Sequence, residues 1–251
     1  MYLSAPRRGR RRRRALLRRL RDERGYTLIE LLVATLAGTI VTGAMAAIVI
    51  VSVHFSSNYN DRVDANQEGR LAMQRITQAL NSSCVSSGVT PIQSGSDQSH
   101  LIFYSSLTDS VPIAPNEVEV QLSGGSLQML TYANTGGSGT TSSPWTFSST
   151  ASPSVTLLQY ANNSTSGGAT VPVFQYYGYN SSGQLTTNLT PASGSTLSAA
   201  NAALVAEVVI TFQALPSDNW NATGRASDVT SSVVLRLTPA SGTTTTSSPC
   251  V

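Results

Sequence analysis

Few side chains in this 251-residue sequence could do catalytic chemistry. There is no lysine, which excludes a P-loop lysine and a Schiff base, and the two histidines, His54 and His100, belong to no HExxH motif. No GxSxG elbow and no CxxC pair occurs. The acids Glu117, Glu119 and Asp218 could bind calcium, but they lack the dense spacing of a calcium loop and better fit a solvated surface. We therefore expect no enzyme, no cofactor and no metal site.

One acid stands out by its position. Glu30 directly precedes residues 31–53, a run of 23 residues without a charged side chain. As a helix this run would be about 34 Å long, enough to cross a hydrocarbon core of about 30 Å. A carboxylate inside that core costs about 2.5–3.5 kcal/mol on insertion scales, so Glu30 needs either a partner or a place at the interface.

Two simpler explanations of the apolar run fit less well. A secretory signal peptide has an apolar region of only about 7–15 residues, which ends at a small-residue cleavage site. The run here is longer, and the sequence SVHFS at residues 52–56 is a poor cleavage site. A plain membrane anchor has the right length but leaves Glu30 unexplained.

The sequence GYTLIELLV at residues 25–33 resembles the processing and methylation motif of type IV prepilins and type II secretion pseudopilins, and the resemblance extends over residues 24–50. It implies that a prepilin peptidase cleaves between Gly25 and Tyr26 and then methylates the new amino terminus at Tyr26, where the family usually has phenylalanine. It also implies that the apolar helix stays on the protein. The implied partners are other pilin or pseudopilin subunits, an inner-membrane assembly platform and membrane lipid.

Cleavage at this position would create a cationic amine on Tyr26, and methylation would keep its charge. We expect Glu30 to pair with the Tyr26 amine of a neighbouring subunit when the apolar helices pack in a filament. The pair would compensate two buried charges and set the axial register. The alternative is that Glu30 reaches the membrane interface and has no role in assembly.

The first 25 residues are strongly basic, with eleven arginines and two acids, whereas the rest of the chain carries a net charge of −6. Arginines beside a first apolar segment are retained in the cytoplasm. This predicts a single-pass protein of the cytoplasmic membrane with its head outside the cytoplasm, and later a place in a surface or periplasmic filament. Nucleic-acid binding by the arginines is the alternative, but no groove-reading element accompanies them, and we predict no direct nucleic-acid partner.

Small residues recur every four positions within the apolar run and form a stripe that would allow close helix packing in lipid. The stripe consists of Thr35, Thr39, Gly43 and Ala47. A composition rich in Ala, Gly and Thr could also produce such a stripe by chance. Gly38, Gly43 and Gly69 are expected to be weak points of the helix, each costing about 1 kcal/mol where it is exposed to water.

Polar residues follow residue 55, and apolar side chains then recur at spacings of three and four, which indicates an amphipathic helix. These side chains are Ala72, Met73, Ile76, Ala79 and Leu80. We expect one helix over residues 26–83, about 87 Å long at about 1.5 Å per residue. Its second half needs a protein surface to cover the apolar stripe.

Short β-prone runs follow residue 84 and alternate with clusters of Gly, Ser, Thr, Asn and Pro. The predicted strands are residues 101–105, 118–122, 127–132, 155–160, 171–177, 206–214 and 232–237. The run EVEVQL at residues 117–122 places its apolar side chains on one face, which predicts an antiparallel sheet packed on the helix. The expected fold is α+β and pilin-like. It would divide into a leader (1–25), an apolar helix half (26–55), an amphipathic helix half (56–83) and a β-rich head (84–251), with exposed loops at 134–143 and 162–168.

Cys84 and Cys250 both lie in the part predicted to be outside the cytoplasm, where an oxidising environment permits a disulfide. We expect the two to be bridged, which would hold the last residues near the end of the helix and stabilise the fold by about 5 kcal/mol. Two free thiols are the alternative.

The predicted function is that of a structural subunit, a minor pilin or pseudopilin, of a type IV pilus-like filament. The size of the head and the sequence QEGRLAMQRITQAL at residues 67–80 are similar to the larger minor subunits, such as PilW-type minor pilins and J-type pseudopilins. A pseudopilin of a type II secretion or DNA-uptake apparatus is one alternative. A membrane-anchored binding or hydrolytic head is the alternative from a different class of protein.

Overall fold

The computed structural model describes residues 26–83, 90–105, 114–138, 142–216 and 226–235. The chain forms two compact units, of which the first ends at Ser56 and the second begins at Ser57. One helix, α2 (Leu28–Asn81), contributes residues to both units. The boundary between the units lies close to residue 55, where the apolar run of the sequence gives way to polar residues.

Helix α2 begins and ends within two residues of the predicted bounds. No proline interrupts its 54 residues. In the second unit, the helix buries the apolar face that its sequence spacing predicted. The buried residues are Ala65, Ala72, Met73, Ile76, Ala79 and Leu80.

The first sheet has four antiparallel strands in the order β1-β2-β3-β6. These strands are β1 (His100–Ser105), β2 (Asn116–Ser123), β3 (Ser126–Tyr132) and β6 (Ser154–Leu158). In β1 and β2, buried and half-buried residues alternate, so that Leu101, Phe103, Val118 and Val120 face the core. This alternation confirms the one-sided sheet expected from residues 117–122.

The second sheet has five strands, with β11-β10-β12-β13 in order and β7 paired beside β10 on β12. The strands are β7 (Ala161–Asn162), β10 (Phe174–Tyr179), β11 (Leu185–Asn188), β12 (Glu207–Ala214) and β13 (Ser227–Val234). Two small hairpins lie outside the sheets, β4 (Asn134–Gly136) with β5 (Thr146–Phe147) and β8 (Thr165–Ser166) with β9 (Ala169–Thr170). A single helical turn, α3 (Ala199–Ala202), precedes β12 and has Ser198 as its N-cap.

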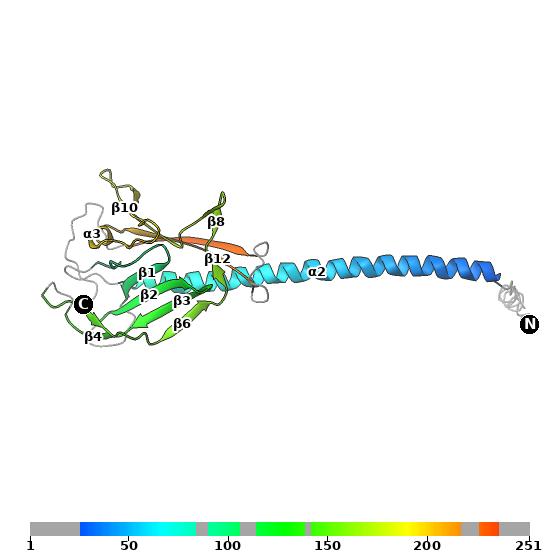
Figure 1. Ribbon diagram of the computed structural model, residues 1–251, viewed down its shortest axis with the longest axis horizontal. Helices are drawn as coiled ribbons and strands as arrows, with labels where there is room; N and C mark the ends of the chain where they lie inside the picture. The colour runs from blue at the N-terminus through cyan, green and yellow to red at the C-terminus, as the bar shows by residue number, and fades with distance from the viewer. Residues whose placement is uncertain (1–25, 84–89, 106–113, 139–141, 217–225, 236–251) are drawn as a thin grey trace, which may run out of the picture. The chain divides into compact units, whose positions relative to one another are not determined.

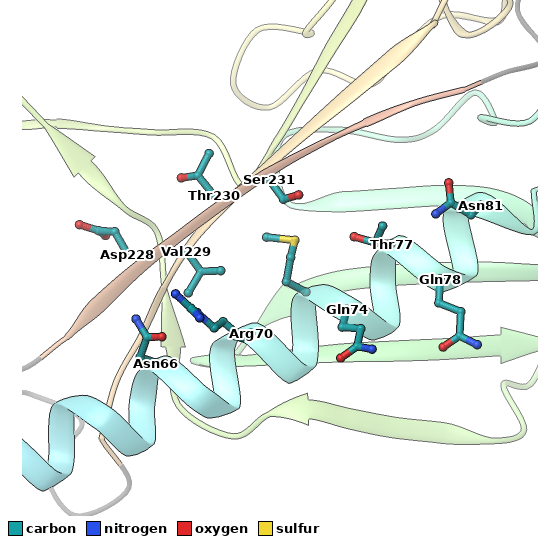
Figure 2. A pocket seen from close by; sticks show the side chains of 11 residues that line it. Asn66, Arg70, Gln74, Thr77, Gln78, Asn81, Asp228, Val229, Thr230 and Ser231 are labelled. Atoms are coloured by element: carbon teal, nitrogen blue, oxygen red, sulfur yellow. The ribbon is translucent and has the colours of Figure 1, made fainter.

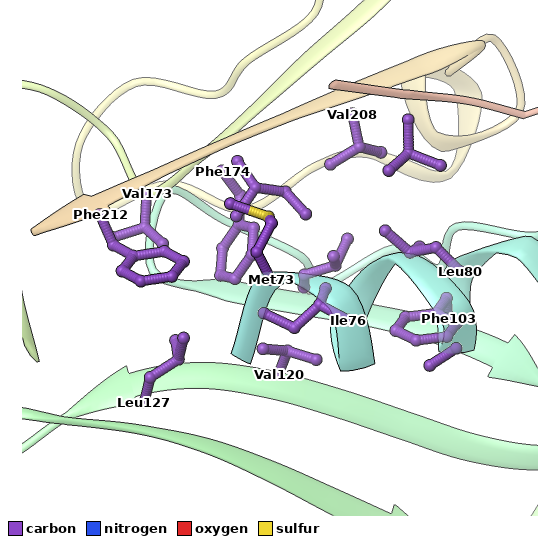
Figure 3. Packing of buried hydrophobic residues seen from close by; sticks show 14 of the residues in the cluster. Met73, Ile76, Leu80, Phe103, Val120, Leu127, Val173, Phe174, Val208 and Phe212 are labelled. Carbon is purple, nitrogen blue, oxygen red and sulfur yellow. The ribbon is translucent and has the colours of Figure 1, made fainter. Parts of the chain in front are cut away.

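The second half of α2 lies between the two sheets and joins them in one core (Figures 1 and 3). Met73, Ile76 and Leu80 meet side chains of both sheets there. From the first sheet come Phe103, Val120 and Leu127, and from the second come Phe174, Val208, Ile210 and Phe212. The helix therefore covers the apolar faces of two sheets, whereas the sequence predicted a single sheet.

Each of the seven predicted strands overlaps a strand of the structure, and two of them have a bound that is wrong by three residues or more. Residues 236–237 of the last predicted strand lie outside the described residues. Residues 171–173 are not part of a strand, since β10 begins at Phe174. Strand β13 begins at Ser227, five residues before the predicted start. Its first half is rich in Ser, Thr and Asp, and its core-facing residues Val229 and Val233 are four positions apart, so the usual apolar alternation is missing.

Gly69 is a point of close packing and not the weak point that its residue type suggested. A Cβ atom added to it would lie 2.7 Å from Val229 Cγ2 and 3.1 Å from Ala214 Cβ. Carbon atoms in contact prefer about 3.5–4.0 Å, so only glycine lets α2 approach β12 and β13 this closely. Gly38 and Gly43 have nothing within 4 Å of the corresponding position.

Candidate assembly segment

The start of α2 carries a capping arrangement that the sequence reasoning missed. Thr27 precedes the helix, and its Oγ1 accepts a hydrogen bond from the Glu30 amide at 3.3 Å, while its carbonyl accepts from the same amide at 3.0 Å. A threonine followed three residues later by glutamate is the capping-box pattern. The spacing T-x-x-E thus predicts the Thr27 cap, and as an acid in the first turn Glu30 also favours the helix through the helix dipole.

The described part of the first unit exposes an apolar surface along its whole length. None of its side chains is buried, and large ones such as Leu28 (83 %), Ile29 (72 %) and Ile48 (69 %) lie open. Helix α2 is long and apolar enough in this part to cross a membrane, by length and composition. An apolar surface of this extent is not stable in water, so it requires either lipid or another protein surface to cover it.

The predicted small-residue stripe lies on this exposed surface. The hydroxyls of Thr35 and Thr39 donate back to the carbonyls of Leu32 and Leu36, at 2.9 and 2.8 Å. Because these hydroxyls are already satisfied within the helix, the stripe offers small, mostly apolar side chains to a neighbour. A close approach of another helix there would leave no hydroxyl group unpaired.

The structure describes Tyr26, Glu30 and the stripe, but it does not test their predicted roles. Tyr26 is 80 % exposed, and Glu30 is also exposed. Gly25, the residue before the expected cut, lies outside the described residues, as do Cys84 and Cys250. Cleavage, methylation, charge pairing and the disulfide therefore remain predictions.

The second unit contains one cluster that resembles a catalytic arrangement by residue type only. Asp97 Oδ1 accepts hydrogen bonds from the amides of Ser99 and His100, at 2.6 and 2.7 Å. Ser99 Oγ and the Asp97 carboxylate both contact the same ring nitrogen, His100 Nδ1, at distances of 3.0–3.1 Å. In a catalytic triad the serine and the carboxylate occupy opposite ring nitrogens, so this geometry does not activate the serine.

The cluster instead anchors the turn before β1. Burial raises the pKa of Asp97, but the hydrogen bonds from Ser99 and His100 outweigh this effect and hold that pKa below its ordinary value. The hydroxyl of the buried Tyr176 donates to the carbonyls of Asp97 and His100, at 2.9 and 3.0 Å. Burial also raises the pKa of Tyr176. These bonds link the first sheet to β10, which is a structural role.

The acids of β2 lie on the outer face of the first sheet. Glu117 lies opposite both Tyr104 and Tyr132, and the Tyr132 hydroxyl donates to Glu119 Oε2 at 3.0 Å. Burial, and then the charge of Glu119, raise the pKa of Glu117, while burial and the charge of Glu117 raise the pKa of Tyr104 to about 12. Among the described residues, no group of three His, Cys, Asp or Glu side chains could hold a metal ion.

A groove of about 860 Å³ runs between α2 and β13 (Figure 2). Amide and hydroxyl side chains make up most of its lining, including those of Asn66, Gln74, Thr77 and Ser231. Arg70 and Asp228 add one charge of each sign. The groove holds no arrangement of groups typical of an active site.

Comparison with known proteins finds a known motif near the start of helix α2. The family described as "Prokaryotic N-terminal methylation motif" matches residues 20–46. No curated protein matches the chain. A solved structure, the GspK-GspI-GspJ complex from the type 2 secretion system of enterotoxigenic Escherichia coli, is similar at 14 % identity and a TM-score of 0.36, covering 70 % of this chain and 97 % of that one. A TM-score this low carries no argument about this chain.

The matched motif leads directly into the exposed apolar helix, as the resemblance of residues 25–33 implied. The match shows that this segment carries an N-terminal methylation motif, which supports the resemblance to type IV prepilins and pseudopilins. The motif and the apolar helix are also consistent with anchoring in a membrane.

Proposed function

We propose that the chain is a minor pilin or pseudopilin of a type IV pilus-like filament. It is stored in the membrane with its head outside the cytoplasm, cleaved after Gly25 and methylated at Tyr26. Its partners are prepilin peptidase, other filament subunits and an assembly platform. A pseudopilin of a secretion or DNA-uptake apparatus shares these features, and neighbouring genes would distinguish the systems.

One observation carries this proposal. The methylation motif at residues 20–46 lies at the start of a helix whose apolar side chains are all exposed in the described residues of the first unit. Such a surface can be covered by lipid before assembly and by equivalent helices after it. The second unit has its own core, which contains no residue of this surface.

Mass spectrometry of the mature amino terminus tests the proposal. The full chain is produced with active prepilin peptidase, with an inactive peptidase, and as the variant Gly25→Val with active peptidase. We expect a methylated Tyr26 as the first residue only in the first case. Gly38→Val, a change inside the helix where glycine has no neighbour within 4 Å, is the control and should still be processed. An intact leader beside an active peptidase would refute the proposal.

The role of Glu30 needs a test that separates charge pairing from helix capping. Glu30→Gln removes the charge, but a glutamine at this position can still complete a capping box, whereas Glu30→Leu removes both. Thr27→Ala removes the cap and keeps the charge, at a cost of about 0.5–2 kcal/mol. If Glu30 pairs with the Tyr26 amine of a neighbour, both Glu30 variants lose incorporation into filaments, and Thr27→Ala keeps it. Normal incorporation of Glu30→Gln would instead assign Glu30 to capping.

A further inference from the structure

The hydrogen bonds of Thr27 fix the residue at which α2 begins. Its carbonyl accepts from the amides of Glu30 and Leu31, at 3.0 and 3.2 Å, and its Oγ1 accepts from the Glu30 amide at 3.3 Å. Leu28 is the first residue of α2, and the exposed Tyr26 precedes the helix without helical conformation. A side-chain oxygen that accepts from the third helical amide is typical of an N-cap, so Thr27 caps α2.

The Glu30 amide is also the donor that an earlier helix start would need. In an α-helix each amide bonds to the carbonyl four residues before it, so a helix extended toward its N-terminus would join the Glu30 amide to the Tyr26 carbonyl. Both oxygens of Thr27 already bind this amide. The cap therefore opposes a longer helix and keeps the backbone of Tyr26 out of it.

The sequence contains a competing cap two residues earlier. Glycine caps a helix about as well as threonine does, and Gly25 occupies this position. A helix capped by Gly25 would begin at Tyr26, and the bond between these two residues would then lie at the start of its first turn. Glu30, three residues after Thr27, favours the later start because this spacing completes a capping box.

The position of the helix start matters for the cleavage that we propose for this chain. Peptidases cut backbone that is locally open, and where opening is fast the rate follows the population of the open form. The removal of an N-cap changes the balance between two helix starts by about 2- to 30-fold. In a chain without the Thr27 cap, a larger fraction of molecules would hold the scissile bond in the helix.

We propose that Thr27 is a positioning residue for this cleavage, because its cap keeps the peptide bond between Gly25 and Tyr26 outside α2, where a peptidase can reach it. The inference rests on the proposed function, in which prepilin peptidase cuts this bond. The methylation motif at residues 20–46 supports that cut independently of the capping geometry. The cap acts on the rate of processing, so a variant without it still matures with time and remains available for assembly.

Cleavage kinetics of the uncleaved full chain in detergent micelles, with purified prepilin peptidase and mass spectrometry, test this role. Thr27→Val keeps the shape of the side chain and removes the capping oxygen. Thr27→Ser and Thr27→Asn keep a capping oxygen, and asparagine has no hydroxyl group. We expect the wild type, Thr27→Ser and Thr27→Asn to be cleaved equally well. Thr27→Val should raise KM by about 2- to 5-fold with kcat unchanged, because a smaller fraction of the chain is competent to bind.

The Cα chemical shift of Tyr26 in the same uncleaved chains measures the helix start directly. We expect a non-helical shift in the wild type and in Thr27→Asn, and a change toward the helical value in Thr27→Val. A direct contact between the peptidase and the threonine hydroxyl would leave this shift unchanged. The two measurements together therefore separate a positioning role from a recognition role.

The failure of this inference differs from the failure of the proposed function. A wild-type chain that active peptidase leaves intact would refute the proposed function. A wild type that is cleaved, beside a Thr27→Val variant with the same KM, would overturn only the role of Thr27. So would a Thr27→Asn variant as impaired as Thr27→Val, or a rise in KM for Thr27→Val without a change in the shift of Tyr26.

Discussion

Replacing Gly69 by alanine changes the free energy of unfolding through two opposing effects, helix propensity and packing. Helix propensity favours alanine over glycine by about 1 kcal/mol in a helix interior. Packing opposes the change, because the new Cβ would lie 2.7 Å from Val229 Cγ2 and 3.1 Å from Ala214 Cβ. Val229 belongs to the core and is β-branched, so its side chain has little freedom to turn away.

The magnitude follows from these distances. Reaching an ordinary carbon–carbon separation of about 3.5 Å requires a displacement of about 0.8 Å between α2 and β13. Overpacking of this kind costs about 1–3 kcal/mol. After subtraction of the gain in propensity, we expect Gly69→Ala to destabilise the second unit by about 1 kcal/mol, or by about 2–4 °C in Tm.

Chemical denaturation of the full chain in detergent, followed by tryptophan fluorescence, measures this difference. The double variant Gly69→Ala, Val229→Ala removes the atom that would clash, so its cost should be smaller than the sum of the two single changes. Gly43→Ala is the control, since nothing lies within 4 Å of its added Cβ. A Gly69→Ala variant as stable as the wild type, with no coupling to Val229, would refute the close-packing explanation.

Two substitutions, followed by denaturation of the full chain, test the electrostatics, and peptide mapping of the unchanged chain tests the disulfide. Asp97→Asn should cost about 1–3 kcal/mol at neutral pH through weakened hydrogen bonds. Because the folded pKa of Asp97 is lowered, the wild type should have the higher free energy of unfolding above about pH 4, and this difference should disappear as the pH falls further. A difference that stays constant in acid would contradict this expectation. Glu117→Gln should stabilise by about 0.5 kcal/mol at neutral pH. Since the folded pKa of Glu117 is raised, the wild type loses stability as the pH rises through that pKa. The extra stability of Glu117→Gln should therefore vanish in acid. A variant that is less stable than the wild type at neutral pH would contradict this expectation. Non-reducing peptide mapping should find Cys84 joined to Cys250, and alkylation of both thiols without reductant would exclude the bridge.

Local patterns in the sequence predicted most elements of the fold. The three- and four-residue spacing of Met73, Ile76 and Leu80 identified the buried face of α2, and strict alternation identified β2. The start of β13 was missed because Ser, Thr and Asp occupy positions where the pattern expects apolar residues. The spacing of Thr27 and Glu30 also predicts a helix cap, because a threonine three residues before a glutamate is the capping-box pattern.

The sequence by itself determined the long apolar segment of the chain and the methylation motif at its start. A charge-free run of 23 residues after Glu30, preceded by arginines and the GYTLIELLV motif, is local information, and its physical meaning depends on length and polarity alone. Only the tertiary structure decided that the second half of the helix lies between two sheets and that Gly69 permits its close approach to β13. These features arise from strand order and from distances between residues far apart in the chain. A side-chain period shows which face of an element is buried, but it does not show which element covers that face.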